Sequence, residues 1–150
     1  IGKVMDSAKM KRKKSPIKYT RKTNEFSFIL KSSAHGIGVF ATHPIRRGTH
    51  LRLFGPRKKE SLVGVLRAKN KVPELHHEHC IPRTEGKLLC PNDFGHQHIG
   101  WYLNHSKTPN AVHKNFIWYA ARDIKKGEEI IIDYNSLGEP EDAIEAYYKK

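Results

Sequence analysis

Three stretches of the 150-residue chain carry residues whose types and spacing suggest chemistry rather than folding alone. The first is the glycine pair of Gly36-Ile37-Gly38, which either lets a ligand approach the backbone closely, because side chains are missing, or only forms a turn. The second, residues 101–110, reads WYLNHSKTPN, and its polar groups either hold a ligand or cap turns. The third, residues 127–135, places Tyr134 after an apolar run, as a catalytic phenol or as a hydrogen-bonded strand end. Each motif alone therefore has two interpretations.

In this order the motifs are far more specific. The combination GxG-x-FA, I-x-x-G, NHS-x-x-PN and RDIKKGEEI-x-x-DY resembles the SET domain of protein lysine methyltransferases, from about Phe26 to Asn135. The resemblance implies a mainly β fold, the β-clip-like SET domain of several small sheets with a few short helices. It also implies a knot-like crossing of the NHS and DY segments, with S-adenosylmethionine and a protein lysine entering from opposite faces.

Site roles follow from the resemblance residue by residue. The methionine part of the cofactor would bind to the backbone of the glycine segment, and the crossing segment would hold the cofactor as well. The implied cofactor-binding residues are Gly36, Ile37, Gly38, Trp101, Asn104 and His105. The resemblance assigns catalysis to Tyr134 and the substrate channel to Ile132, Tyr119 and Tyr134. No metal site is expected.

The chemistry of the implied reaction explains why few acids and bases are needed. A sulfonium methyl is already activated, so an enzyme must align a neutral lysine amine about 3 Å from it and exclude water. A lysine with a pKa of ~10.4 costs roughly 4 kcal/mol to present in its neutral form near pH 7.4. An apolar channel lowers this pKa by desolvation, and Tyr134 suits an orienting role better than that of a strong base.

Several positions depart from the family pattern. Leu53-Phe54-Gly55 stands where a YxG tyrosine is common, and Trp101 replaces an arginine often found three residues before NHS. Ile132 occupies the place of a Phe or Tyr that helps to set the number of methyl groups, so the degree of methylation stays open. A catalytically silent SET module that binds protein or nucleic acid is therefore the alternative function.

The histidine-rich stretch has enough ligand types for zinc. His76-His77-Glu78-His79-Cys80, Cys90 and His96-Gln97-His98 nevertheless match no standard four-ligand spacing. No cysteine cluster follows Tyr134 to bind zinc there. We therefore expect an ordinary loop in an insert between the SET motifs, with no metal.

Charge is unevenly distributed along the chain. The net charge is +13, and residues 1–22 carry nine Lys/Arg against Asp6 alone, a net of +8. This composition predicts a disordered leader, either solvated or in contact with nucleic acid, followed by a domain over residues 23–150. A basic enzyme repels a basic substrate such as a histone, so either a local acidic groove or shared nucleic acid must offset the repulsion. One such acidic cluster consists of Glu139, Glu141, Asp142 and Glu145.

Cysteine usage and hydropathy indicate the cellular compartment. Cys80 and Cys90 are too few for a disulfide framework, which favours a reducing interior: the cytoplasm of a prokaryote, or the nucleus for a eukaryotic or viral protein. No apolar run approaches the ~20 residues of a membrane span.

An internal repeat indicates how the chain positions these motifs. Residues 40–51 align without gaps on residues 119–130, an aromatic-Ala pair followed by Ile-basic-basic-Gly, which predicts two related strand-turn-strand hairpins. Other expected elements are strands over 25–30, 88–90, 112–120 and 130–132, a turn over 32–38, and helices over 60–69 and about 139–149.

Overall fold

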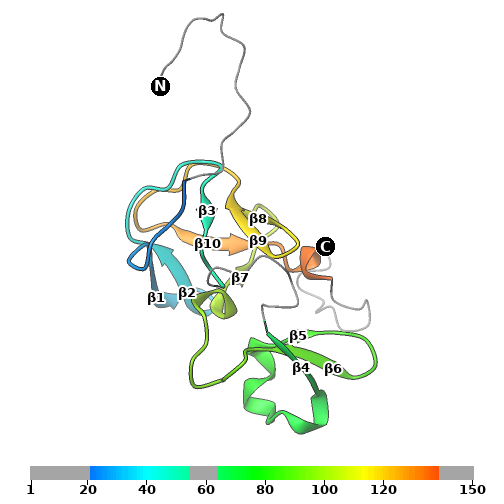
Figure 1. Cartoon of the computed structure of the whole chain (residues 1–150). Helices are drawn as coiled ribbons and strands as arrows, with labels where there is room; N and C mark the ends of the chain where they lie inside the picture. Colours follow the sequence, from blue (N-terminus) through cyan, green and yellow to red (C-terminus); the bar gives the residue numbers. More distant parts are fainter. Residues whose placement is uncertain (1–20, 55–63, 139–150) are drawn as a thin grey trace, which may run out of the picture.

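The computed structural model describes residues 21–54 and 64–138, and the predicted leader up to residue 20, the C-terminal helix and its acidic cluster lie outside them. Strands dominate the described chain (Figure 1). They are β1 (Phe28–Ser33), β2 (Gly36–Ala41), β3 (His50–Leu51), β4 (Val65–Ala68), β5 (Ile81–Pro82), β6 (Lys87–Cys90), β7 (Asn104–His105), β8 (Ala111–Lys114), β9 (Ile117–Ala120) and β10 (Glu129–Ile132). Short 3₁₀ helices connect them: η2 (Lys69–Lys71), η3 (Glu74–His79), η4 (Ile99–Tyr102) and η5 (Tyr134–Leu137). No helix of this described part is long and apolar enough to cross a membrane.

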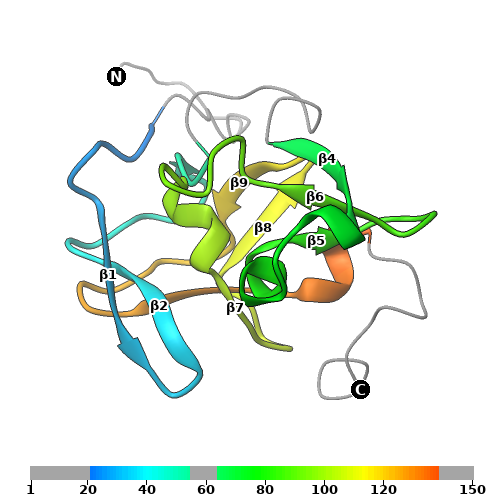
Figure 2. The ribbon, with the colours of Figure 1, turned by 90° about the horizontal axis from the view of Figure 1, so that it is seen from below.

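The strands form three small sheets in the orders β1-β2-β10-β7, β3-β9-β8 and β4-β6-β5. Seen from below, the β1–β2 hairpin lies at one edge of the molecule and the β4–β6–β5 sheet at the opposite side (Figure 2). The main core draws on all three sheets and includes Val39, Leu51, Trp118 and Ile130, each at most 1% exposed.

The internal repeat is real, but its units are not hairpins. Ile45 and Ile124, equivalent at the offset of 79, pair with each other through hydrogen bonds of 2.8 and 2.7 Å. Each unit then sends its second strand to the other unit, so that β3 pairs with β9, and β10 pairs with β2. The predicted hairpins are wrong because the apolar Ile anchor makes each turn a corner between two sheets. Gly48 and Gly127 take the same φ of 85° at these corners, which favours glycine.

The helix predicted over 60–69 is also wrong where the structure describes it, because Val65–Ala68 forms β4 and pairs with β6. Leu62, Val65 and Leu66 suggested a helical face, but short apolar patterns do not distinguish the two structures. Gly64 has a packing reason instead: a Cβ there would lie 2.1 Å from the carbonyl oxygen of Cys90. The brief strand predicted over 88–90 is confirmed within β6.

The strand predicted over 112–120 is two strands, β8 and β9, joined at Asn115 and Phe116. Both turn residues have positive φ, 54° and 63°, the conformation of a two-residue hairpin turn. Phe116 is unusual in this position. Its ring is buried and packs edge-on against Trp118, which holds the turn in place.

Near the start of the domain the first strand lies later than expected. The strand predicted over 25–30 is β1, Phe28–Ser33, and the strand predicted over 130–132 is confirmed within β10. The turn predicted over 32–38 is confined to Ala34-His35, because Gly36 to Gly38 already pair with β1. Lys22, which its charge groups with the leader, pairs in parallel with His50 of β3.

Candidate active site

A crossing of two distant segments builds the centre of the site. The two residues of β7 run parallel to β10, with Asn104 opposite Ile131 and His105 opposite Ile132. The backbone N–H of Ser106 then donates to Ile132 O at 2.8 Å. The pairing brings the NHS and DY motifs together, so the N–H of Tyr134 donates to His105 Nδ1 at 3.1 Å.

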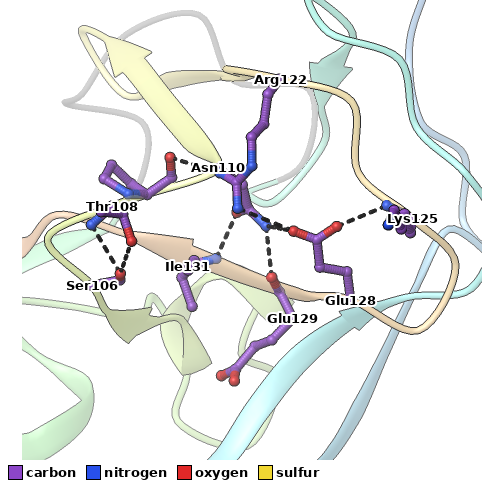
Figure 3. Close-up of polar contacts among 9 residues, drawn as sticks. Ser106, Thr108, Asn110, Arg122, Lys125, Glu128, Glu129 and Ile131 are labelled. Carbon is purple, nitrogen blue, oxygen red and sulfur yellow. Dashed lines mark hydrogen bonds and ion pairs between the residues drawn. The ribbon is translucent and has the colours of Figure 1, made fainter.

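A buried asparagine holds this crossing in register. Asn110 is 0% exposed, and its Nδ2 donates to Glu129 O at 2.7 Å and to Glu128 Oε2 at 3.2 Å. Its Oδ1 accepts from the N–H of Ile131 at 2.9 Å, as Figure 3 shows. One side chain thus pairs with two backbone groups of β10, the N–H of Ile131 and the carbonyl oxygen of Glu129.

The side chain of Asn104 joins the crossing to the glycine segment. Its Nδ2 donates to Ile37 O and to Ser33 Oγ, both at 3.1 Å, and to Glu129 Oε2 at 2.7 Å. Glu129 is a site residue that the motif analysis missed. The second Glu of GEEI, one residue before an apolar run and therefore at the start of a strand, was the available signal.

Close packing explains the second glycine of the pair. A Cβ at Gly38 would lie 2.3 Å from Glu129 Oε2 and 3.0 Å from Asn104 Nδ2. Gly36 has a φ of 101°, which strains other residues, and the side chain of Ile37 is 54% exposed. The segment is therefore exposed at Gly36 and Ile37, whereas Gly38 is buried against the carboxylate of Glu129 and the amide of Asn104.

His105 is held in its neutral form. Burial lowers the pKa of His105, the carboxylate of Asp133 opposes this effect, and the charges of Lys107 and His35 lower the pKa further. A neutral ring is consistent with Nδ1 accepting from the N–H of Tyr134, because protonation of Nδ1 would break that bond.

A pocket of about 70 Å³ lies next to Tyr134. Apolar and aromatic side chains predominate among its lining residues, which are Phe54, Glu78, His79, Cys80, Ile81, Gly100, Trp101, Leu103, Trp118, Ile132, Tyr134 and Leu137. The hydroxyl of Tyr134 donates to Leu103 O at 2.6 Å. The insert supplies Glu78 to Ile81, a contribution that the motifs did not indicate.

Strand β10 separates the pocket from the polar groups around Asn104. Successive side chains of a strand point to opposite faces, so Glu129 and Ile132 lie on different sides of β10. Glu129 contacts Asn104, and Ile132 is 3% exposed and lines the pocket. Tyr134 follows β10 directly; its N–H donates to His105, the residue after Asn104 in β7, and its hydroxyl donates to Leu103 O beside the pocket.

Trp101 and Tyr119 are predicted site residues that the structure places in different surroundings. Trp101, predicted beside the cofactor, is 7% exposed and lines the pocket. Its ring packs edge-on against that of Phe54, with the ring centroids 5.4 Å apart. Tyr119, predicted in the substrate channel, pairs with His50 across β3 and β9, on the opposite side of β9 from the pocket-lining Trp118. The structure therefore groups Ile132, Trp101 and Tyr134, and leaves Tyr119 outside the pocket.

Among the described residues no group of three His, Cys, Asp or Glu side chains is arranged to hold a metal ion. Cys80 and Cys90 are buried free thiols. Burial, with the hydrogen bond and charge of Cys90, raises the pKa of Cys80 to about 12. A thiol with so high a pKa is a poor metal ligand and nucleophile at neutral pH.

A family model for the SET domain matches residues 36–135. The chain belongs to the SET-domain family. The matched range begins at the first glycine of the pair and ends one residue after Tyr134. It therefore includes the residues on both faces of β10, Glu129 as well as Ile132. The predicted family and its β-rich fold are confirmed.

Solved structures show the same fold. The complex of KRYPTONITE with mCHG DNA and SAH has a TM-score of 0.50 and 21% identity, covering 83% of this chain and 26% of that chain. Its complex with mCHH DNA, an H3(1-15) peptide and SAH has a TM-score of 0.50 and 20% identity, covering 84% and 26%. A Plasmodium falciparum protein described as a candidate histone methyltransferase has a TM-score of 0.44 and 19% identity, covering 73% of this chain and 93% of that chain. This chain thus covers about a quarter of the KRYPTONITE chain that it matches. No curated protein sequence matches this chain.

Proposed function

We propose that this SET domain is a protein-lysine N-methyltransferase that uses S-adenosylmethionine. The observation that carries the proposal is the position of Tyr134 at the junction of the two motifs, where its N–H donates to His105, the residue after Asn104, and its ring lines an apolar pocket. A transfer between two ligands that enter from opposite sides needs a residue at this junction. The structural neighbours in the KRYPTONITE complexes hold SAH, and one also holds an H3 peptide.

The polar side suits the cofactor. Gly36 and Ile37 are exposed, Asn104 donates to Ile37 O, and His105 follows Asn104 in β7. The amino-acid part of the cofactor is zwitterionic, and both signs of charge are at hand in Glu129 and Lys107. When bound, S-adenosylmethionine supplies a methyl group on positively charged sulfur.

The pocket suits the target lysine. Trp101, Trp118 and Ile132 would strip water from the aliphatic stem and the amine, which lowers the pKa of the lysine and favours its neutral form. The hydroxyl of Tyr134 and the carbonyl oxygen of Leu103, 2.6 Å apart, are the polar groups that would orient the amine. With an isoleucine at position 132, the degree of methylation remains to be measured.

The experiment is incubation with radiolabelled S-adenosylmethionine and a panel of histones and other basic, nucleic-acid-associated proteins, with cofactor affinity measured by calorimetry. Tyr134→Phe keeps the ring and loses the orienting hydroxyl, so single-turnover methylation should fall on the order of 10²-fold with cofactor affinity little changed. The matched control is Tyr102→Phe, whose ring stacks on His79 and does not line the pocket. Near-wild-type turnover in Tyr134→Phe would remove this residue from catalysis.

A silent SET module that binds a protein or nucleic acid is the second candidate. The amide of Asn104 supports it, because three acceptors of the protein itself already share the two protons of its Nδ2. A folded wild type that neither binds S-adenosylmethionine in calorimetry nor methylates any substrate would establish this alternative.

We also propose an intracellular protein, in the cytoplasm of a prokaryote or in the nucleus for a eukaryotic or viral source. The two free, buried thiols support a reducing compartment. Immunoblotting of fractionated cells tests the location, and recovery in a secreted fraction would contradict it.

A further inference from the structure

The β3–β9–β8 sheet has an outer face that the methyl-transfer site does not use. Its three strands lie side by side in Figure 1. The inner face carries Leu51, Trp118 and Ala120, all buried in the core. Because side chains alternate along a strand, the outer face carries His50, Tyr119 and Val112 across the three strands.

Rings occupy the middle of this outer face. The rings of His50 and Tyr119, paired across β3 and β9, have centroids 5.7 Å apart at an interplanar angle of 42°. Val112, opposite Tyr119, is 45% exposed, and Tyr119 and His50 are partly exposed. Burial lowers the pKa of His50, and so do the nearby charges of Lys22 and Arg52, so the ring is neutral near pH 7.

Cations surround these rings. Lys22 pairs in parallel with His50, Arg52 follows His50 by two residues on the same face, and Lys114 lies at the far end of β8. All three side chains are exposed. None of the residues that alternate onto this face, Lys22, His50, Arg52, Val112, Lys114, Ile117 and Tyr119, is acidic.

We propose that the outer face of the β3–β9–β8 sheet binds single-stranded nucleic acid. Aromatic rings on an open sheet can stack against unpaired bases, and cations at its edges contact phosphates. The bases of a duplex are stacked on each other and cannot reach the rings, so a single strand is the preferred ligand. This surface is distinct from the active site, since Trp118 on the other side of β9 lines the pocket.

The leader raises a second source of binding that the test must separate. Lys22 is the last of nine Lys/Arg in residues 1–22, and such a segment binds any polyanion through charge alone. Charge attraction does not depend on an aromatic ring or on unpaired bases. Loss of oligonucleotide binding after removal of one ring therefore indicates binding at the sheet face rather than at the leader. Binding of an acidic protein partner would not require the ring either.

The experiment measures fluorescence anisotropy of labelled single-stranded and duplex oligonucleotides of equal length with the full chain, without cofactor. Tyr119→Leu keeps apolar bulk but removes the ring, and should weaken single-strand binding about tenfold, because one stacked base contributes that much or more. Tyr119→Phe keeps the ring and should bind as the wild type does. Circular dichroism verifies that each variant is folded.

A second variant tests the cations without touching the ring. Arg52→Ala should lower the slope of log affinity against log salt by about 0.7, the contribution of one phosphate contact to a single strand. Lys87→Ala, an exposed charge of the β4–β6–β5 sheet, is the matched control and should leave the slope unchanged. The proposal is overturned if no oligonucleotide binds, if duplex and single strand bind equally, or if Tyr119→Leu and Arg52→Ala both match the wild type.

Discussion

Asn110 should be among the most costly residues of the domain to replace, although no ligand is assigned to it. Asn110→Ala leaves two groups of β10 without their partners, the N–H of Ile131 and the carbonyl oxygen of Glu129. Each buried unsatisfied group costs about 1–3 kcal/mol, so the free energy of unfolding should fall by about 2–6 kcal/mol. This is a large share of the stability of about 5–15 kcal/mol that is usual for a domain.

Asn110→Asp is the sharper test because it hardly changes the shape. The new carboxylate can still accept from the N–H of Ile131, but it faces two further oxygens, Glu129 O and Glu128 Oε2, with no proton to donate. We expect a loss of stability at pH 7 that shrinks as the pH falls, because a protonated carboxyl regains one donor.

Urea denaturation followed by circular dichroism at pH 7 and at lower pH measures both effects. Asn92→Ala removes an exposed asparagine side chain and should stay within about 0.5 kcal/mol of the wild type. If Asn110→Ala also stays within that range, or if the Asp variant loses more stability at lower pH than the wild type does, the hydrogen-bond argument is refuted.

Three further predictions concern packing, protonation and thiol reactivity. Gly38→Ala should destabilise the domain by about 1–3 kcal/mol, because its Cβ would lie 2.3 Å from Glu129 Oε2, and a double-mutant cycle with Glu129→Ala should show coupling in thermal denaturation. Burial by itself would raise the pKa of Glu128, but the N–H of Lys125, the Asn110 amide and the charges of Arg122 and Lys125 outweigh it, so the pKa is lowered. The wild type should therefore be more stable than Glu128→Gln by about 1 kcal/mol, since the group is partly exposed. This stability difference should be largest above the ordinary glutamate pKa and should vanish as the pH falls through the lowered pKa of Glu128. A difference that does not change with pH would contradict the prediction. Cys80, with a pKa raised to about 12, should react with a thiol reagent at pH 8 far more slowly in the folded protein than in urea, and equal rates would contradict its burial.

Motif order alone identified the family and the residues of the crossing. Asn104, His105 and Tyr134 are recognisable in the sequence because their spacing from apolar runs is local information. The repeat was also visible, since an Ile anchor and a Gly turn recur at a fixed offset. These features depend on neighbours within a few residues, which a sequence displays directly.

The pairing of the strands of the two repeat units could be determined only from the tertiary structure. Each unit could close on itself as a hairpin, but the pairing of Ile45 with Ile124 turns both into corners that exchange strands. The helix predicted over 60–69 failed for the same reason, because the strand that stabilises Val65–Ala68 is β6, some twenty residues later. Pairing energies between distant segments leave little trace in local periodicity.

The face of the sheet on which each site residue lies could likewise be determined only from the tertiary structure. Glu129 and Ile132 are three residues apart in one strand, yet one reaches the amide of Asn104 and the other lines the pocket. Trp101, in η4, lines the pocket, whereas Tyr119 does not, because its place in β9 directs its side chain to the other face of the sheet from Trp118. The residue types that chemistry requires are written in the chain, whereas the face on which each one acts depends on strand register, which only the folded sheet specifies.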